Sequence, residues 1–442
     1  MKLKINNFAK IKEADVIIDG ITVIAGENNT GKSTVGKILF SLFNSLSNVD
    51  EKIFEERLKE IEHTNIMVIQ NSIVEADVSR SMVFRSALNI SRKIDSQIRK
   101  EIGLNGIISD KGLFDIIENI VKSWWKTREE EENVELVRAI DKVYKNTNEL
   151  LNLPENTIIL EIVSRYFKKV FHSQMESVTV DEAAETRVNL DIKGKQEQLF
   201  FKNNCCKEIV DNVKIIHKAI YIDNPFVIDE LSRNQHSILN PMNELLIDLI
   251  TSKSQEGILD GVVETVRAKE KLNDIYETLQ SVIDGEVLIS PSDGEYYLKN
   301  SDFSEPIAFQ NLSTGMKSFV ILKMLLEQGC IKEKDVIILD EPEIHLHPQW
   351  QIAYAELIVL LQKHFDLSVV VTTHSPYFVD AINLFSCKYG TDSRVNYYLS
   401  SNVGNTVTME NVTEKIDLIY KKMASPVQML DTLRYELNNN MR

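Results

Sequence analysis

A short, mostly apolar segment followed by a glycine-rich turn constrains the fold of this chain more than any other feature. Residues 21–25 lead into a Gly-x4-Gly-Lys-Ser pattern, which reads Gly26-Glu27-Asn28-Asn29-Thr30-Gly31-Lys32-Ser33. Backbone N–H groups of such a turn wrap phosphate oxygens, and the N-terminus of the following helix adds a favourable dipole. The sequence therefore predicts a strand, a phosphate-binding loop and a helix in direct succession.

Individual positions in this loop have predicted roles. Lys32 is expected to reach the β- and γ-phosphates of ATP, and the Ser33 hydroxyl is expected to ligate Mg²⁺. The other expected nucleotide contacts are Gly26, Asn28, Asn29, Thr30, Gly31 and Thr34. A helix is predicted next, because apolar residues recur at i, i+3, i+4, i+7, i+8 and i+11. They are Val35, Ile38, Leu39, Leu42, Phe43 and Leu46.

Length and composition restrict the remaining possibilities. With 442 residues the chain exceeds one ordinary core, so two or three structural units are expected. The 50 basic and 66 acidic residues give a net charge of −16, so nucleic-acid binding would need a local basic patch. The four cysteines show no disulfide or metal spacing, and the N-terminus lacks a signal-peptide core. Since no run approaches the roughly 18 apolar residues of a membrane helix, we expect a cytoplasmic protein without a membrane partner.

The chain is expected to divide into a discontinuous α/β head and a helical insertion. Residues 48–177 have helical patterns and little glycine, so they form the predicted insertion, and residues 1–47 and 178–442 form the head. Residues 226–284 are predicted as a second helical segment within the head. Inside the insertion, the acidic run at 129–132 is interpreted as a solvated helical face and Trp124-Trp125 as packing between helices.

Several strands are predicted within the head. Asp19-Gly20 separates two apolar runs, which predicts a hairpin with an antiparallel neighbour beside residues 21–25. The segment 8–12 is a candidate for the adenine contact. A second hairpin is predicted at 186–203, with its turn near residues 193–195. Further strands are predicted at 214–222, 287–290, 295–299 and 307–310.

A Ser-Thr-Gly turn before an apolar helix is a second candidate anion site. Ser313, Thr314 and Gly315 precede a helix rich in apolar residues. Free N–H groups, a hydroxyl and the helix dipole suit an anion, although a serine in this place is most often a plain helix cap.

Two carboxylates follow a buried strand further along the chain. Residues 336–339 are apolar, and Asp340 and Glu341 come directly after them, where open α/β sheets bind ligands. Asp340 is expected to hold Mg²⁺ opposite Ser33, and Glu341 to polarise the attacking water as general base. After the next strand, at 367–371, His374 is expected to contact the γ-phosphate. These residues, with Lys32, are the predicted catalytic and metal-binding groups.

Two nearby histidines raise the question of a zinc site. His345 and His347 are separated by one residue and lie close to a glutamate. The spacing lacks a third and a fourth ligand, so a structural and dimer-contact role is favoured over metal binding.

The order of these motifs resembles that of ABC-type ATPase heads. The forms LSTG, DEPEIHLHP and TTHSP resemble the soluble branch, which includes SMC- and RecF-like proteins and the ATPase half of the overcoming-lysogenization-defect family. Anti-phage ATPases such as the Septu PtuA and PARIS AriA proteins share this branch. The resemblance covers residues 1–45 and 305–385 with specific motifs. It implies an α/β head whose mixed sheet carries the P-loop, with an antiparallel β subdomain and a large helical insertion.

The resemblance also implies how the site is completed. In such heads two subunits sandwich two ATP molecules, so Ser313 and Gly315 are expected to contact the nucleotide of a second copy. Thr314 and Met316 depart from the usual LSGGQ signature, which affects the expected hydrolysis rate.

Two further departures concern the rest of the chain. No clear Q-loop glutamine follows residue 222, and Asp223 and Asn224 are the positional candidates. Lysogenization-defect proteins carry a Toprim nuclease after the ATPase, whereas only residues 377–442 follow Thr-His-Ser-Pro here and end in a predicted charged helix at 415–437. We therefore expect no nuclease within this chain.

Two functions remain open from the sequence. The first is an ATPase that dimerises around nucleotide and regulates a separately encoded effector, a nuclease or toxin, with antiviral defence as the setting that the resemblance implies. The second is a DNA-binding repair ATPase of the RecF or SMC type, which requires a basic stripe. The nucleotide-binding subunit of a membrane transporter fits poorly, since those heads lack an insertion of about 180 residues before the equivalent strand.

Overall fold

The structure is a computed structural model that describes residues 1–72, 80–125, 134–177, 185–210, 215–231, 240–251, 273–291, 294–300 and 304–440. Residues 1–47 and 162–442 form one compact unit, and residues 48–161 form another. The sequence placed the end of the insertion at residue 177, but the boundary falls at 161, inside α6 (Glu155–Phe171). The end of α6 belongs to the head because the rings of Phe167 and Phe171 pack against Phe8.

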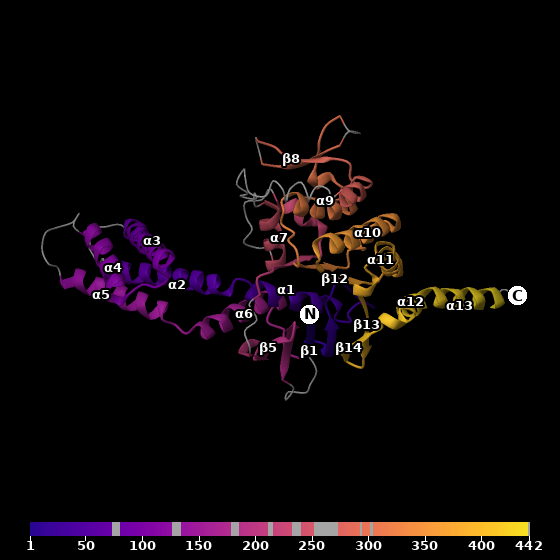
Figure 1. The fold of residues 1–442 in the computed structure, drawn as a ribbon, viewed down its shortest axis with the longest axis horizontal. Helices are drawn as coiled ribbons and strands as arrows, with labels where there is room; N and C mark the ends of the chain where they lie inside the picture. Colours follow the sequence, from indigo (N-terminus) through magenta and orange to yellow (C-terminus); the bar gives the residue numbers. More distant parts are fainter. Residues whose placement is uncertain are drawn as a thin grey trace. The chain divides into compact units, whose positions relative to one another are not determined.

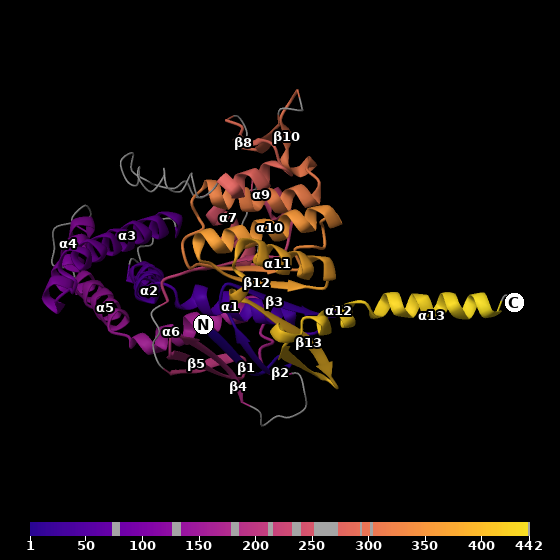
Figure 2. The same ribbon diagram turned by 45° about the vertical axis from the view of Figure 1, so that its right-hand side comes forward.

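An 11-stranded mixed sheet forms the centre of the head, in the order β6-β5-β4-β1-β2-β14-β13-β3-β12-β11-β7 (Figures 1 and 2). The first seven strands of this sheet in chain order are β1 (Lys2–Phe8), β2 (Ile11–Ile17), β3 (Ile21–Gly26), β4 (Thr186–Ile192), β5 (Lys195–Lys202), β6 (Cys205–Val210) and β7 (Ala219–Ile222). The later strands are β11 (Val336–Asp340), β12 (Ser368–Thr373), β13 (Val395–Val403) and β14 (Thr406–Asn411).

Five neighbouring strands, β13, β3, β12, β11 and β7, run parallel. Helices α10 (Pro348–Phe365) and α11 (Pro376–Tyr389) cover one face, and α1 (Lys32–Leu46) lies on the other (Figures 1 and 2). A Cβ at Gly36 of α1 would lie 2.6 Å from Cγ2 of Ile338, so this helix packs very close to β11. Burial on both faces explains why β3 and β11 are continuous apolar runs.

The hairpin predicted at Asp19-Gly20 is wrong. β2 pairs with β1 and β14, whereas β3 lies between β12 and β13, both parallel to it. A strand that is buried at every position belongs at the centre of the sheet, where parallel neighbours cover both of its edges. Gly20 meets a different requirement: its φ is +59°, and a Cβ there would lie 2.3 Å from the carbonyl oxygen of Arg394.

Strands β2, β1, β4, β5 and β6 form the predicted antiparallel part of the main sheet. β4 and β5 form the hairpin predicted at 186–203, and its turn lies at Lys193-Gly194. A separate three-stranded sheet contains β8 (Glu286–Ile289), β9 (Tyr296–Lys299) and β10 (Ile307–Ala308). The α/β class, with a mixed P-loop sheet, an antiparallel subdomain and a helical region, is therefore confirmed.

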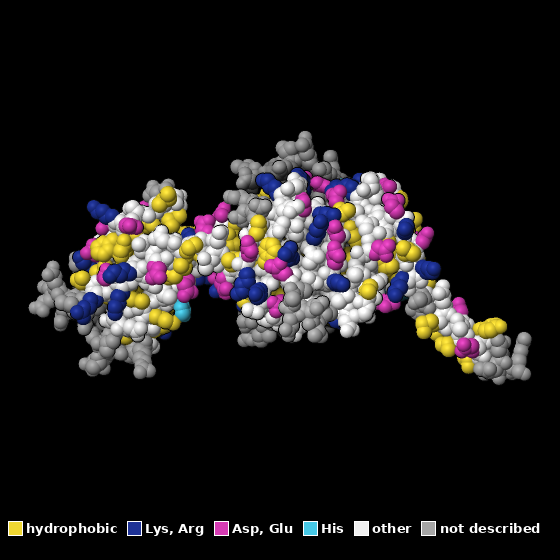
Figure 3. Space-filling view, turned by 90° about the horizontal axis from the view of Figure 1, so that it is seen from below, with side chains coloured by type: hydrophobic (Ala, Val, Ile, Leu, Met, Phe, Trp, Pro, Cys, Tyr) yellow, Lys and Arg dark blue, Asp and Glu magenta, His cyan; other side chains and the backbone are white. Residues whose placement is uncertain are grey.

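The other helical elements of the head complete this framework. They are η1 (Pro225–Glu230), α7 (Pro241–Thr251), η3 (Phe309–Asn311), α9 (Thr314–Glu327), η4 (Asp392–Arg394), η5 (Thr413–Lys415), α12 (Asp417–Met423) and α13 (Ser425–Asn440). Much of the helical segment predicted at 226–284 lies outside the described residues, but η1, α7 and a helical stretch at 273–280 fall within it. The charged helix predicted at 415–437 consists of α12 and α13, and α13 leaves apolar side chains exposed (Figure 3).

The second unit is helical. It contains α2 (Val49–Ser72), α3 (Arg80–Asn105), α4 (Asp110–Trp125) and α5 (Val134–Leu151), together with the start of α6. Trp124 packs against the apolar core of this unit, as expected, whereas the acidic run at 129–132 lies outside the described residues. None of the described helices is both long and apolar enough to span a bilayer.

Candidate active site

The glycine-rich turn connects β3 to α1 and adopts the conformation that its sequence predicts. Asn29 and Gly31 have φ values of 63° and 73°, which asparagine and glycine tolerate best. Gly31 is the N-cap of α1, and among the described residues no side chain caps that helix. The first N–H groups of α1 are therefore available to an anion at the turn.

Lys32 lies within this loop with its ammonium group directed at backbone oxygens. It is 3% exposed, and Nζ donates to the carbonyl oxygens of Gly26 (3.0 Å) and Glu27 (2.8 Å). Nζ also lies 3.3 Å from Oε1 of Glu341. These oxygens hold the charge of a buried lysine in the place where the phosphates of a nucleotide are expected.

Asp340, the last residue of β11, receives hydrogen bonds from side chains on the two neighbouring strands and from Ser33. Ser33 Oγ donates to Oδ1 (2.9 Å), and Tyr221 OH donates to Oδ2 (2.6 Å). Thr372 Oγ1 also donates to Oδ1. β7, β11 and β12 are adjacent and parallel, so their carboxyl ends meet at one edge of the sheet. The oxygens of Ser33 and Asp340 suit Mg²⁺, which prefers hard oxygen ligands.

Glu341 is held by its backbone beside the P-loop. Its φ is 50°, and its N–H donates to both the carbonyl oxygen (3.1 Å) and Oγ1 (3.0 Å) of Thr372. With residues 29–34, Ala9 and Lys10, it lines a hollow of about 220 Å³. The turn after β1 thus borders the phosphate loop, and the adenine contact of residues 8–12 stays a prediction.

His374 directly follows β12 and faces two carboxylates. Its Nδ1 lies 3.9 Å from Oε2 of Glu341 and 3.4 Å from Oε1 of Glu343. Lys32, Ser33, Asp340, Glu341 and His374, predicted from three distant parts of the chain, therefore lie in one place.

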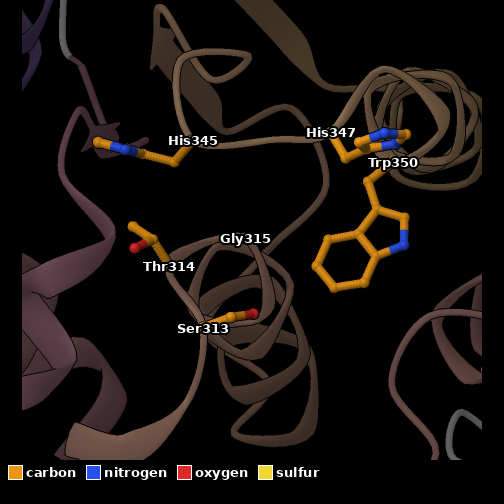
Figure 4. A pocket seen from close by; sticks show the side chains of 6 residues that line it. All are labelled: Ser313, Thr314, Gly315, His345, His347 and Trp350. Carbon is orange, nitrogen blue, oxygen red and sulfur yellow. The ribbon is translucent and has the colours of Figure 1, made fainter.

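The Ser-Thr-Gly turn opens a separate hollow of about 410 Å³ (Figure 4). Ser313 is the N-cap of α9, and its Oγ accepts from the N–H of Met316 (3.4 Å). The hollow is lined by Ser313, Thr314, Gly315, His345, His347 and Trp350. None of these residues lines the P-loop hollow, so this turn does not complete the P-loop hollow of its own chain.

The two histidines of the zinc hypothesis have other partners. Nδ1 of His347 accepts from the N–H of Gln349 (3.4 Å) and caps α10. The ring of His345 lies edge-on to Phe226 at 5.8 Å. The described residues contain no cluster of three or more His, Cys, Asp or Glu arranged to hold a metal ion.

The Q-loop candidates differ in what their side chains do. Asn224 Oδ1 accepts from the N–H of Phe226 (3.0 Å) and caps η1, so its side chain has a structural role. Asp223 follows Ile222, which pairs with Leu339 in the parallel register, so it is level with Asp340 at the sheet edge. Burial, and next the charge of Asp340, raise the pKa of the Asp223 carboxyl above its ordinary value.

Several important residues were not identified from the sequence. Tyr221 lies on a predicted strand and Thr372 directly follows another, but their bonds to Asp340 depend on strand order. Lys317 is 2% exposed and binds both oxygens of Asp229 (2.6 and 2.7 Å), which joins η1 to the start of α9. No sequence pattern pairs these two residues.

The fold and site together define a P-loop nucleotide-binding protein of the α/β class. The AAA ATPase domain family matches residues 1–379, and the chain belongs to that family.

The curated relatives include proteins of defence systems. The chain is 23% identical to Endonuclease GajA of Bacillus cereus (strain HuB5-5) over 402 residues, covering 86% of this chain and 55% of GajA. It is 36% identical to Septu protein PtuA of Bacillus thuringiensis over 139 residues, 28% of each chain. It is 26% identical to the Retron Ec83 probable ATPase of Escherichia coli over 230 residues, 46% of this chain and 41% of that one. The predicted resemblance to defence ATPases is thereby confirmed, and the chain spans about half or less of the length of these relatives.

Solved structures show a weaker likeness. The SMC head domain from Thermotoga maritima aligns with 93% of this chain and 98% of its own, at 12% identity and a TM-score of 0.37. The SmcHead bound to the C-winged helix domain of ScpA aligns with 93% of this chain and 97% of its own, at 13% identity and a TM-score of 0.40.

Proposed function

We propose that this protein binds MgATP and hydrolyses its γ-phosphate between two copies of the chain, and that this cycle regulates a separate effector in antiviral defence. The observation that carries the proposal is the convergence of Lys32, Ser33, Asp340 and Glu341 at the carboxyl edge of the parallel strands.

Each of these residues has a role that its geometry permits. When ATP binds, Lys32 exchanges the carbonyl oxygens of Gly26 and Glu27 for phosphate oxygens. Ser33 and Asp340 would hold Mg²⁺, which neutralises charge that develops on the phosphates. Glu341, 22% exposed and 3.3 Å from Lys32, accepts a proton from the attacking water.

A second copy is part of this proposal because, among the described residues, the Ser-Thr-Gly turn does not line the P-loop hollow of its own chain. The turn at Ser313 to Gly315 lines a different hollow, at the N-terminus of a 14-residue helix. A helix N-terminus with a hydroxyl suits a phosphate. We infer that it meets the γ-phosphate bound by a partner copy.

Glu341→Gln is the direct test. The amide cannot accept the proton, so ATP should persist and hold two chains together. Light scattering with ATP should then give a mass near twice the 50.6 kDa of one chain, whereas Lys32→Ala, the control, should stay at the lower mass. Wild-type turnover by the Glu341→Gln protein would contradict the assignment of the base.

Completion of the site by the partner can be tested by mixing two inactive variants. Lys32→Ala lacks a P-loop lysine but keeps its Ser-Thr-Gly turn, and Ser313→Arg keeps its P-loop but blocks that turn. A mixed dimer contains one intact composite site, so ATPase activity should return on mixing. If mixtures of the two variants show no ATPase activity at any ratio, the proposal of a shared site fails.

The defence setting draws support from the relatives, which include a Septu protein and a probable retron ATPase. The effector remains a proposal, because the chain matches only part of each relative. Co-expression with the products of neighbouring genes, followed by phage challenge, tests it: protection should require both Lys32 and a nuclease or toxin gene.

DNA binding is the second candidate function, and the distribution of charged side chains favours it less than the first. Lys and Arg are interspersed with Asp and Glu on the face in Figure 3. Arg92 pairs with Glu62 (3.2 Å), and Arg99 pairs with Asp95 (2.9 Å) and Glu55, so these cations already have partners. ATP-dependent retention on DNA at physiological salt would reverse this ranking.

A further inference from the structure

A buried carboxylate lies behind the residue that is expected to contact the γ-phosphate. Glu343 is 3% exposed, although it comes only two residues after the predicted base. Its Oε1 accepts from Thr373 Oγ1 (2.5 Å) and from the backbone N–H of His374 (2.7 Å). Nδ1 of His374 lies 3.4 Å from the same oxygen. One carboxylate oxygen therefore faces the backbone and the ring of a single residue.

The second oxygen of Glu343 has different surroundings from the first. Oε2 is buried and has no hydrogen-bond partner in the described part of the chain. Burying a carboxylate is unfavourable, and burial raises the pKa of Glu343, whereas the bonds from Thr373 and His374 lower it. Among the described residues, the ring of His374 is the one ionisable base within ion-pair distance of Glu343.

The orientation of the imidazole follows from these contacts. Glu341 Oε2 lies 3.9 Å from Nδ1, so both nearby carboxylates face the same ring nitrogen. A carboxylate keeps the proton on the nitrogen that it faces, which leaves Nε2, at the other side of the ring, for a ligand. The side chain of His374 is 45% exposed, so a ligand can reach it.

A second set of hydrogen bonds, through Gln351, joins the segment after Glu341 to the loop that contains His374. Gln351 Nε2 donates to the carbonyl oxygens of Glu343 (3.3 Å) and Leu346 (3.1 Å). Ser375 Oγ donates to Oε1 of Gln351 (2.9 Å). The segment after Glu341 and the loop after β12 are therefore connected on both sides of His374.

We propose that Glu343 is a positioning residue for ATP hydrolysis, an inference that rests on the proposed function. It holds the backbone of His374, fixes the proton on Nδ1, and stabilises the protonated ring when Nε2 donates to a γ-phosphate oxygen. Glu343 acts through His374 and, since it is 3% exposed, is not expected to touch the nucleotide itself.

A double-mutant cycle separates this role from a purely structural one. Glu343→Ala should lower kcat about ten- to hundredfold, the usual range for a residue that orients a functional ligand, while KM for ATP changes less than about threefold. In a His374→Ala background the same substitution should lower kcat less than about twofold, because the group that it positions is gone. Equal losses in both backgrounds would overturn the proposal.

Matched variants control for folding. Glu343→Gln keeps the shape of the side chain and one acceptor oxygen. Its melting temperature and its KM for ATP should therefore stay close to those of the wild-type protein, while its kcat should be lower. Glu356→Gln removes a carboxylate from α10 that binds Lys388 and Tyr389 on the surface, and should leave kcat unchanged. If Glu343→Gln matches wild type in kcat, the charge has no role and the inference fails.

A spectroscopic test does not depend on turnover. Long-range ¹H–¹⁵N NMR of the His374 ring, assigned by its loss in His374→Ala, should show the Nδ1–H tautomer in the wild-type protein and a mixture in Glu343→Ala. If the wild-type protein shows no ATPase activity, the proposed function is refuted. The NMR measurement of the His374 tautomer would still decide whether Glu343 positions that ring. An Nε2–H tautomer in the wild-type protein would refute the positioning role alone.

Discussion

The Ser-Thr-Gly turn permits a prediction whose magnitude follows from contact distances. A Cβ built at Gly315 would lie 2.8 Å from both Cε3 and Cζ3 of Trp350, and 3.2 Å from the carbonyl oxygen of His345. Optimal carbon–carbon contacts are about 3.5–4.0 Å, so Gly315→Ala requires a displacement of at least about 0.7 Å. The Trp350 ring packs edge-on against Phe319 (6.1 Å), which limits its retreat.

The expected cost is that of overpacking, about 1–3 kcal/mol of unfolding free energy. The functional loss should be larger, because a shift approaching 1 Å in a site that must meet a phosphate can cost about a hundredfold in rate. Binding of a fluorescent ATP analogue should change little, since the P-loop hollow shares no lining residue with this turn. ATP-dependent dimerisation and turnover should both fall.

Two variants sharpen the comparison. Trp350→Leu in the Gly315→Ala background removes the ring that the new methyl group meets, and should restore part of the stability and turnover. Gly103→Ala lies in α3 with no atom within 4 Å of the new Cβ, and should be neutral or slightly stabilising. Wild-type dimerisation and turnover in Gly315→Ala would refute both the contact and the role of the turn.

Three further predictions concern the buried charges. Lys32→Ala should abolish detectable ATP hydrolysis and weaken ATP binding by calorimetry, and unchanged turnover would exclude this site. Asp223→Asn should weaken Mg²⁺-dependent turnover. Without nucleotide, its melting temperature should exceed that of wild type by a margin that grows as pH rises from the ordinary Asp pKa to the raised pKa of Asp223 and is constant above it. The sign follows because the folded-state pKa of Asp223 is raised, so its ionisation above the ordinary Asp range opposes folding; an equal or lower melting temperature would contradict this. Lys317→Ala should lower stability by about 1–3 kcal/mol in chemical denaturation, because it removes the buried cation that donates to both oxygens of Asp229, and an unchanged stability would contradict a stabilising pair.

Local patterns predicted the parts of the site that lie on single elements. The Gly-x4-Gly-Lys-Ser turn, the capped helix at Ser313 and the buried strand before Asp340 each need only a few neighbouring residues to be recognised. Their physical basis is local: glycine permits positive φ, a serine oxygen caps an N–H group, and a continuous apolar run is buried on both faces.

Strand order could not be predicted in the same way. The Asp19-Gly20 turn has the local signature of a hairpin, but the neighbours of β3 come from residues 368–373 and 395–403. Pairing between distant strands depends on which buried faces fit together, which no short window contains.

The sequence by itself determined that this chain has a phosphate loop, two carboxylates after a buried strand and a histidine after the next one, because each is a local pattern. Only the tertiary structure decided that Tyr221 and Thr372 bind Asp340, that Glu343 faces His374, and that the turn at Ser313 lines a hollow of its own. These relations depend on parallel strands ending at one edge and on loops that pack across it. The P-loop identifies a nucleotide-binding protein, and the surrounding fold determines which side chains can act on the nucleotide.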